Sequence, residues 1–311
     1  MIGTDSLKKS QDNTYKNLQI KRMSYFYIII AAILWGTVGI LGKKLGESGF
    51  DNLQIVFIRA MGACVALSLF LLIKDKNLFK IKPRHFIYFI GTGILSFVFF
   101  NWCYFIAVNK TSIAAAAILL YTAPTIIMVL SSILFKEKMT QNKILSLVLT
   151  FIGCLLVTVF VQGTGQQFTI TGILAGLGAG FGYALYSIFG RYALEKYHSL
   201  TVTCYTFIFA SIGLVPITDI KEMFILFSDI NAIIYAILLS MAGTVMPFLL
   251  YTKGLSNLET GNASIIATLE PVVAALLGII LYNEPVTVFK IAGISLVIFA
   301  LYIIREKKHQ Q

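Results

Sequence analysis

The sequence predicts an all-α integral membrane protein with ten transmembrane helices in two inverted five-helix repeats and both termini in the cytoplasm. Three observations predict this fold class: the composition, the spacing of the apolar segments and an internal repeat. Of the 311 residues, 58% are hydrophobic and only 13% are charged, and the mean hydropathy is +0.83. A soluble domain carries about a quarter charged residues. We therefore expect a multi-pass protein of the inner or plasma membrane.

Ten apolar segments of roughly 20 residues each are long enough to cross a bilayer. Because the bilayer core offers no water to the backbone, and because the segments do not alternate as barrel strands do, each is expected to be a helix. The segments are 24–42, 53–73, 86–108, 112–135, 143–161, 170–190, 200–217, 232–252, 261–282 and 286–304.

The positive charges predict the orientation of these spans. Alternate connections, counted together with the two tails, hold 19 Lys and Arg residues, whereas the other set of connections holds five. Cationic loops remain in the cytoplasm, so both termini are expected there, with 1–23 as a disordered tail and 305–311 as a short one. The net charge of +11 belongs to these loops, and we expect a lipid bilayer around the chain and no nucleic-acid partner.

Reactive side chains are scarce within the predicted spans. The histidines lie in loops or in the tail, and no carboxylate pair occurs inside a span. We therefore expect no catalytic residues, no metal site, no cofactor and no enzymatic activity. The four cysteines are expected to be small buried side chains, and they are Cys64, Cys103, Cys154 and Cys204.

The chain repeats itself at an offset of 147 residues. Segment 116–140 aligns with 263–287 without a gap, with eight of 25 positions identical. The identities include Pro124 with Pro271 and Glu137 with Glu284, at the same spacing in both copies. The repeats are expected to be 24–161 and 170–304. Five spans in each repeat would make the second copy enter the membrane from the opposite side, a pattern typical of secondary transporters with a site at the midplane.

Four stretches resemble the EamA-type transporters of the drug/metabolite transporter superfamily, and the resemblance extends over 24–304. They are "AAILWGTVGILGKKL", "VFIRAMGA", "YTAPTIIMVLSSILFKEK" and "TLEPVVAALLGIILYNEPV". The resemblance implies export or exchange of small metabolites, often amino acids and related compounds, by alternating access. A channel, a membrane scaffold or, less readily, a membrane-embedded enzyme are the alternatives.

Glu270 is the only acidic residue placed inside a predicted span, and Pro271 follows it directly. A charged residue at a helix centre costs about 2.5 to 3.5 kcal/mol on the insertion scale. Pro271 removes one donor and frees the carbonyl of Ala267. Glu270 is either a buried pairing residue or a group that contacts substrate or carries a coupling proton.

Arg59 is the only cation placed deep in a predicted span. From the rise of a helix, its Cα is expected about 8 Å along the membrane normal from that of Glu270. Arg59 could extend to the outer interface, pair with Glu270 or bind a substrate carboxylate.

Other polar and aromatic residues within spans are candidates for the lining of a small-molecule site, although each alone is also ordinary packing material. Together they would suit an amphipathic metabolite. The candidates are Trp35, Asn101, Trp102, Tyr104, Tyr121, Tyr183, Tyr186 and Asn262, with helix kinks at Pro124 and Pro271.

Overall fold

The computed structural model describes residues 2–159 and 169–304, and every regular element in these ranges is helical. Nine helical segments in them are long and apolar enough to cross a membrane. They correspond to the first nine predicted spans. The tenth, Val288–Ile304, is an apolar helix of 17 residues. The predicted fifth span was extended to residue 161, and its last two positions lie outside the described residues.

The described residues 2–159 form eight α-helices. Two short 3₁₀ segments (Lys76–Phe79 and Pro83–His85) follow the third, and a π-helical segment (Gly91–Val98) follows the fourth. The α-helices are α1 (Ile2–Gly36), α2 (Val38–Glu47), α3 (Asn52–Lys74), α4 (Phe86–Ile90), α5 (Phe99–Lys110), α6 (Ile113–Leu120), α7 (Ala123–Leu134) and α8 (Gln141–Val159).

The described residues 169–304 form eight further α-helices. A 3₁₀ turn (Val215–Ile217) follows the second of them, and a π-helical segment (Met241–Val245) follows the fourth. The α-helices are α9 (Ile170–Leu194), α10 (Ser199–Leu214), α11 (Ile220–Leu226), α12 (Ile230–Ser240), α13 (Met246–Leu255), α14 (Thr260–Ala267), α15 (Leu269–Tyr282) and α16 (Val288–Ile304).

Helix starts follow from capping side chains in the sequence. The Asp51 carboxylate accepts from the N–H of Gln54 at 2.8 Å, and the Gln54 side chain accepts from the N–H of Asp51 at 2.9 Å, which forms a capping box for α3. The Ser112 hydroxyl accepts from the N–H of Ala115 at 3.0 Å at the start of α6. These caps satisfy orphan donors of the first turn.

Two of the predicted spans are broken where a proline follows. Pro124 is the second residue of α7, after the interruption between α6 and α7, and Pro271 is in the first turn of α15, after the interruption at Thr268. Proline tolerates the first turn of a helix but not its interior. At each proline where a kink was predicted, one or two turn residues separate two α-helices within a single span.

Helix boundaries recur 147 residues apart. The starts of α3, α5, α6 and α8 are followed at this offset by the starts of α10, α13, α14 and α16, and the π-helical segments end at Val98 and Val245. The last turns of α7 and α15 are alike as well. Lys136 (φ 56°) and Asn283 (φ 53°) both adopt the left-handed conformation that ends many helices.

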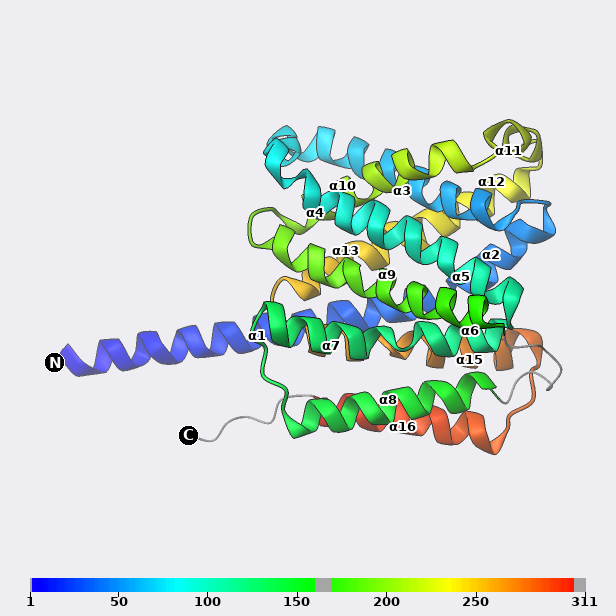
Figure 1. Ribbon diagram of the computed structural model, residues 1–311. Helices are drawn as coiled ribbons and strands as arrows, with labels where there is room; N and C mark the ends of the chain where they lie inside the picture. Colours follow the sequence, from blue (N-terminus) through cyan, green and yellow to red (C-terminus); the bar gives the residue numbers. More distant parts are fainter. Residues whose placement is uncertain (1, 160–168, 305–311) are drawn as a thin grey trace.

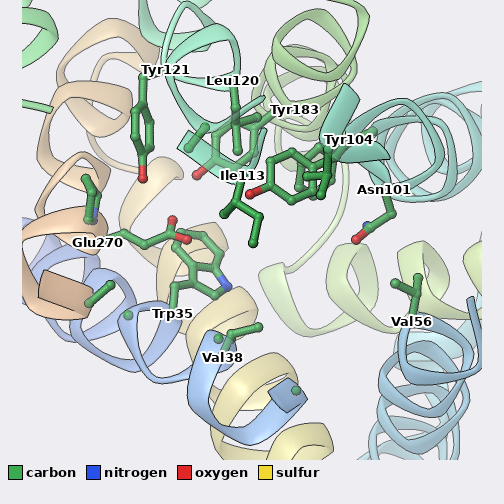
Figure 2. Close-up of a pocket in the computed structure, with 18 of the residues that line it drawn as sticks. Trp35, Val38, Val56, Asn101, Tyr104, Ile113, Leu120, Tyr121, Tyr183 and Glu270 are labelled. Atoms are coloured by element: carbon green, nitrogen blue, oxygen red, sulfur yellow. The ribbon is translucent and has the colours of Figure 1, made fainter. Parts of the chain in front are cut away.

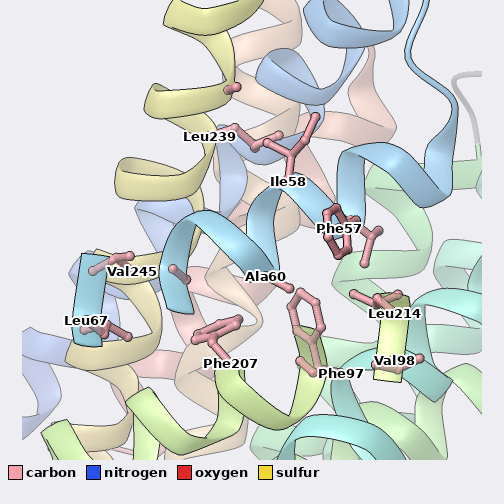
Figure 3. Packing of buried hydrophobic residues seen from close by; sticks show 14 of the residues in the cluster. Phe57, Ile58, Ala60, Leu67, Phe97, Val98, Phe207, Leu214, Leu239 and Val245 are labelled. Atoms are coloured by element: carbon pink, nitrogen blue, oxygen red, sulfur yellow. The ribbon is translucent and has the colours of Figure 1, made fainter. Parts of the chain in front are cut away.

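Figure 1 shows a helical bundle in which the equivalent helices α8 and α16 lie side by side and run in opposite directions. Helices α3 and α10 do the same. The largest buried cluster joins α3, α10 and α12, with Phe57, Phe97, Phe207 and Leu239 among its members (Figure 3).

The N-terminal segment differs from its prediction. Residues 1–23 were expected to be disordered because they are polar, but α1 begins at Ile2 and continues without interruption into the first span. The extension belongs to the same helix because nothing between Ile2 and Gly36 is a proline or a glycine pair that would break it.

Candidate functional site

A cavity of about 1020 Å³ lies inside the bundle. It extends from Trp35 and Glu270 in the middle of the bundle to the exposed Lys43 and Glu47 at one end. Its walls come from α1, α2, α3, α5, α6, α8, α9, α13, α15 and α16 and from the π-helical segment Gly91–Val98, so both halves of the chain contribute (Figure 2).

Glu270 lies in the first turn of α15, and its carboxylate points into the cavity between the Tyr121 hydroxyl and the Trp35 ring (Figure 2). The side chain is half-buried. Within residues 2–159 and 169–304 it forms no hydrogen bond and no ion pair. A carboxylate in such surroundings has acceptor capacity to offer a ligand.

Arg59 lies on α3 and also lines the cavity. Its Nε donates to Thr244 Oγ1 at 3.2 Å, and its Cζ is 5.6 Å from the centroid of the Phe97 ring. Phe97 and Thr244 are 147 residues apart and lie in the two π-helical segments. The predicted alternative of an ion pair with Glu270 is not found, because no N–O contact within 4.0 Å joins the two described side chains. The terminal guanidinium nitrogens remain available for a ligand.

Aromatic rings form much of the remaining wall. Trp35 packs edge-on against Phe248 with centroids 5.2 Å apart, and Tyr183 packs edge-on against Phe100 at 5.7 Å. Tyr104 also packs against Phe100, in a tilted arrangement with centroids 6.2 Å apart. Rings held in such contacts give a ligand a preformed apolar surface.

Most of the predicted site residues meet in this one cavity. Those that line it are Trp35, Arg59, Asn101, Tyr104, Tyr121, Tyr183, Tyr186, Glu270 and Pro271.

Three predicted residues lie elsewhere. Trp102 is 55% exposed and points away from the cavity, because one residue along a helix turns the side chain about 100° from its neighbour Asn101. Asn262 is buried at the opposite end of the bundle, where its Nδ2 donates to Glu259 Oε2 at 3.4 Å. Pro124 borders a small hollow of about 20 Å³ next to the cavity.

Sequence reasoning missed several contributors. Arg59 is supported by Thr244 and Phe97, and Trp35 is supported by Phe248. The sequence does not identify these three residues, because an aromatic residue or a threonine in an apolar segment is indistinguishable from an ordinary packing residue. Arg59 is also not the only buried cation, since Lys143 is 6% exposed and Lys290 is 2% exposed. The charge count includes both lysines with the connections, although Lys143 begins the predicted span 143–161 and Lys290 lies near the start of 286–304. Their equivalence in the repeat is the signal that could have distinguished them from loop lysines.

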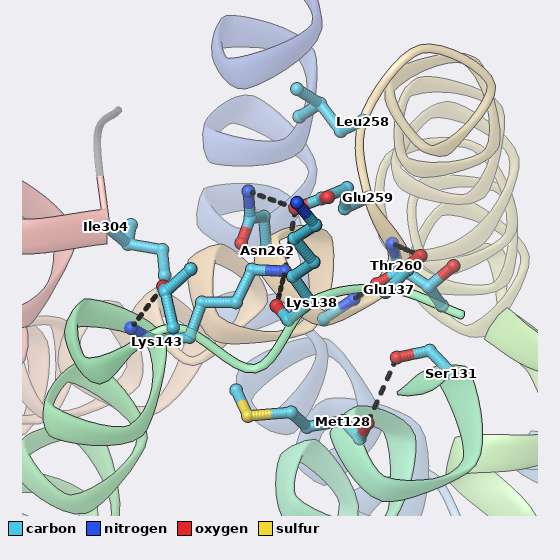
Figure 4. A network of polar contacts seen from close by, with 12 residues as sticks. Met128, Ser131, Glu137, Lys138, Lys143, Leu258, Glu259, Thr260, Asn262 and Ile304 are labelled. Carbon is cyan, nitrogen blue, oxygen red and sulfur yellow. Dashed lines mark hydrogen bonds and ion pairs between the residues drawn. The ribbon is translucent and has the colours of Figure 1, made fainter. Parts of the chain in front are cut away.

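Polar contacts close the path from the cavity to the opposite end of the bundle. The Tyr186 hydroxyl bonds to the Thr252 hydroxyl at 2.6 Å, and the Ser187 hydroxyl bonds to the Tyr251 hydroxyl at 2.7 Å. Arg191 Nη1 donates to the carbonyl of Leu255 at 2.9 Å. Figure 4 shows a further network at this end, in which the backbone N–H of Thr260 donates to Glu137 and the Lys143 ammonium pairs with Glu259. The cavity therefore reaches one end of the bundle only.

Comparison with known proteins places this architecture among transporters. The sequence profile of the EamA-like transporter family matches residues 22–159 and again 170–305. An uncharacterized transporter of Archaeoglobus fulgidus is 27% identical over 277 residues, which cover 89% of this chain and 94% of the relative. The uncharacterized transporter YyaM of Bacillus subtilis is 25% identical and covers 77% of this chain and 80% of the relative.

A solved crystal structure has the same fold, with a TM-score of 0.72 over 91% of this chain and 97% of the other chain at 15% sequence identity.

Proposed function

Because the chain belongs to the EamA-like transporter family and is a multi-pass transporter of the cell membrane, we propose that it carries a small zwitterionic metabolite, an amino acid or a related compound, through the cavity by alternating access. The observation that carries this proposal is that a carboxylate without a partner among the described residues, Glu270, and a guanidinium, Arg59, both line the same cavity. The names of the family and of the relatives are those of transporters rather than of enzymes.

The charges support a substrate with both signs of charge. Glu270 can accept hydrogen bonds from an ammonium group, and Arg59 can bind a carboxylate through its two terminal nitrogens. Because Glu270 and Arg59 do not pair with each other, a ligand can bind both without first breaking an ion pair within the protein. The rings around Trp35 and Tyr183 provide an apolar surface for the rest of the molecule. A cavity at the upper end of the usual 300 to 1,000 Å³ leaves room for water or a bulky side chain.

We propose ten spans in two inverted repeats, with both termini in the cytoplasm. The antiparallel packing of the equivalent helices α8 and α16 and the shared helix starts support the repeat. With this orientation the loops 48–51, 110–112 and 283–287 face the outside, and the cavity reaches that side. The conformation is then outward-facing.

We propose export or exchange as the direction, with a proton on Glu270 as a candidate coupling ion. A carboxyl that binds either a proton or a substrate ammonium would link the two movements, because the charged form alone attracts the ammonium. A channel would not need a closed inner end such as the one formed by Tyr186, Thr252 and Arg191.

Counterflow in proteoliposomes tests the proposal. Vesicles loaded with an unlabelled amino acid should accumulate the labelled compound, which a channel or a scaffold does not produce. The matched amine without a carboxylate, and the matched acid without an amino group, should compete at least tenfold less well, as expected for the loss of one charge-assisted contact.

Arg59→Gln should reduce the preference for the amino acid over its amine by about tenfold, because only the amino acid has the carboxylate. Lys221→Gln, an equal loss of charge on the exposed part of α11, should retain the preference. Equal competition by amino acid and amine in the wild type would exclude Arg59 as the carboxylate anchor.

A further inference from the structure

Glu137 connects the two halves at the closed end of the bundle. Its Oε1 accepts from the backbone N–H of Thr260 at 2.6 Å, and its Oε2 accepts from the N–H of Gly261 at 3.1 Å. These are the first two residues of α14, whose N-cap residue Glu259 makes no capping bond of its own. A carboxylate at a helix N-terminus satisfies orphan donors and favours the helix dipole. The contact therefore joins the end of α7 to the start of α14 and holds this end shut.

Lys143 is the second charged group of this closed end. Its ammonium pairs with Glu259 Oε2 at 2.7 Å and donates to the carbonyl of Lys138 at 2.8 Å, and the side chain is almost fully buried. Lys143 thus contacts the loop that carries Glu137 and the residue that precedes α14.

The same residues recur 147 positions later at the open end. Glu284 corresponds to Glu137, and Lys290 corresponds to Lys143. The local backbone is also the same, because the N–H of Glu137 donates to the carbonyl of Ser131 at 3.3 Å and that of Glu284 donates to the carbonyl of Gly278 at 3.3 Å. Both glutamates therefore leave their helices from an equivalent turn.

The contacts of the second glutamate differ. Glu284 Oε2 accepts from the buried ammonium of Lys290 at 2.8 Å, within its own half of the chain. The positions equivalent to Thr260 and Gly261 are Ile113 and Ala114, the first two residues of α6. No described side chain accepts from their N–H groups, since Ser112 caps only the N–H of Ala115. Glu284, Ile113 and Ala114 all line the cavity. The Glu284 carboxylate and the N–H groups of Ile113 and Ala114 therefore border the same space but are not hydrogen-bonded to each other.

We propose that Glu284 is the outer latch of this transporter: when the outer mouth closes, its carboxylate binds the N–H groups of Ile113 and Ala114, while Glu137 releases Thr260 and Gly261 and the inner end opens. The inference rests on the proposed alternating access. The two latches are mutually exclusive. A carrier held closed at both ends would not transport, and a carrier open at both ends would leak. Each latch is then a positioning contact that stabilises one of the two states.

Hydrogen–deuterium exchange of the full-length protein in lipid nanodiscs tests the latches without any transported substrate. Glu137→Gln removes one of two acceptor oxygens and the charge. Exchange over 258–264 should rise on the order of tenfold, the change expected for lost charge-assisted bonds. Exchange over 111–117, at the opposite end of the bundle, should fall because Glu284 now protects it. Glu284→Gln should leave 111–117 at least as exposed as in the wild type and lower the exchange over 258–264.

Exposed glutamates provide matched controls. Glu195→Gln at the inner end and Glu222→Gln at the outer end should change neither segment. A rise over 258–264 in Glu137→Gln with no change over 111–117 would mean a static helix cap and would overturn the proposal. If Glu137→Gln does not fold, unchanged exchange over 258–264 in Glu284→Gln overturns it as well. Failure to transport any amino acid would refute the proposed cargo. The exchange result would still be interpretable, because that experiment uses no transported substrate.

Discussion

At the scale of single residues, the site depends on two charged side chains, Glu270 and Arg59, that do not form an ion pair with each other. An intramembrane charge is retained only where a partner, water or a function compensates its cost. Arg59 has Thr244 and Phe97 as neighbours, whereas Glu270 faces the cavity with no protein donor among the described residues. The equivalent of Glu270 in the first half is Ala123, so the repeat supplies the helix break and only one half supplies the acid.

Glu270→Gln should reduce the transport rate by about tenfold or more, because an amide gives the substrate ammonium a weaker contact than a carboxylate. The remaining transport should lose its pH dependence, because an amide does not carry the coupling proton. Initial rates in proteoliposomes at several pH values measure both effects.

The exposed Glu222→Gln is the matched control and should behave as the wild type. A Glu270→Gln protein with wild-type rate and wild-type pH profile would remove Glu270 from the site.

Sequence could identify Glu270 and Arg59 because charge is conspicuous in an apolar span. It could not separate Asn101, which lines the cavity, from Trp102, which is exposed on the outer surface of the bundle. The two residues are adjacent, and the rotation of their helix about its axis is fixed by packing against neighbours rather than by composition.

At the scale of elements, helices are interrupted where the cavity is formed. Tyr121, in the gap between α6 and α7, lines the cavity, as do Ser96 and Phe97 of the first π-helical segment. Glu270 and Pro271 line it directly after the gap between α14 and α15. Pro124 and Pro271 indicate the gaps between α6 and α7 and between α14 and α15 in the sequence. The π-helical segments carry no comparable signal, because an added residue per turn arises from tertiary packing.

Helices α8 and α16 meet through glycines. A Cβ added at Gly153 would lie 2.8 Å from the carbonyl oxygen of Gly293 and 2.7 Å from Val297 Cγ2. Gly153→Ala should therefore lower the stability by about 1 to 3 kcal/mol, the usual cost of overpacking, although alanine is the better helix former. Thermal unfolding of the purified protein measures the change.

Gly39→Ala is the control for this helix-propensity effect, because no atom lies within 4 Å of a Cβ added there. It should be neutral or stabilising. A Gly153→Ala protein that melts at the same temperature as Gly39→Ala would show that the two helices separate easily.

At the scale of the whole molecule, the repeat is the most informative feature of the sequence. The 147-residue offset recurs in the starts of α3 and α10, of α6 and α14, and of α8 and α16. Hydropathy could place the membrane segments, but it could not reveal which end of the cavity is open. That depends on contacts such as Glu137 with Thr260, because the total free energies of the two states of a carrier differ by only a few kcal/mol.

The orientation of the two halves is the prediction that belongs to this scale. Met139 and Val286 are 147 residues apart, follow the equivalent helices α7 and α15, and are both exposed. If the repeats are inverted, they lie on opposite sides of the membrane. In a chain whose four native cysteines are replaced, a membrane-impermeant maleimide added to intact cells should label Val286→Cys and should label Met139→Cys only after permeabilisation. Labelling of both from the same side would mean parallel halves. The two latches would then have no opposite ends to close, and the alternating-access proposal would fail with them.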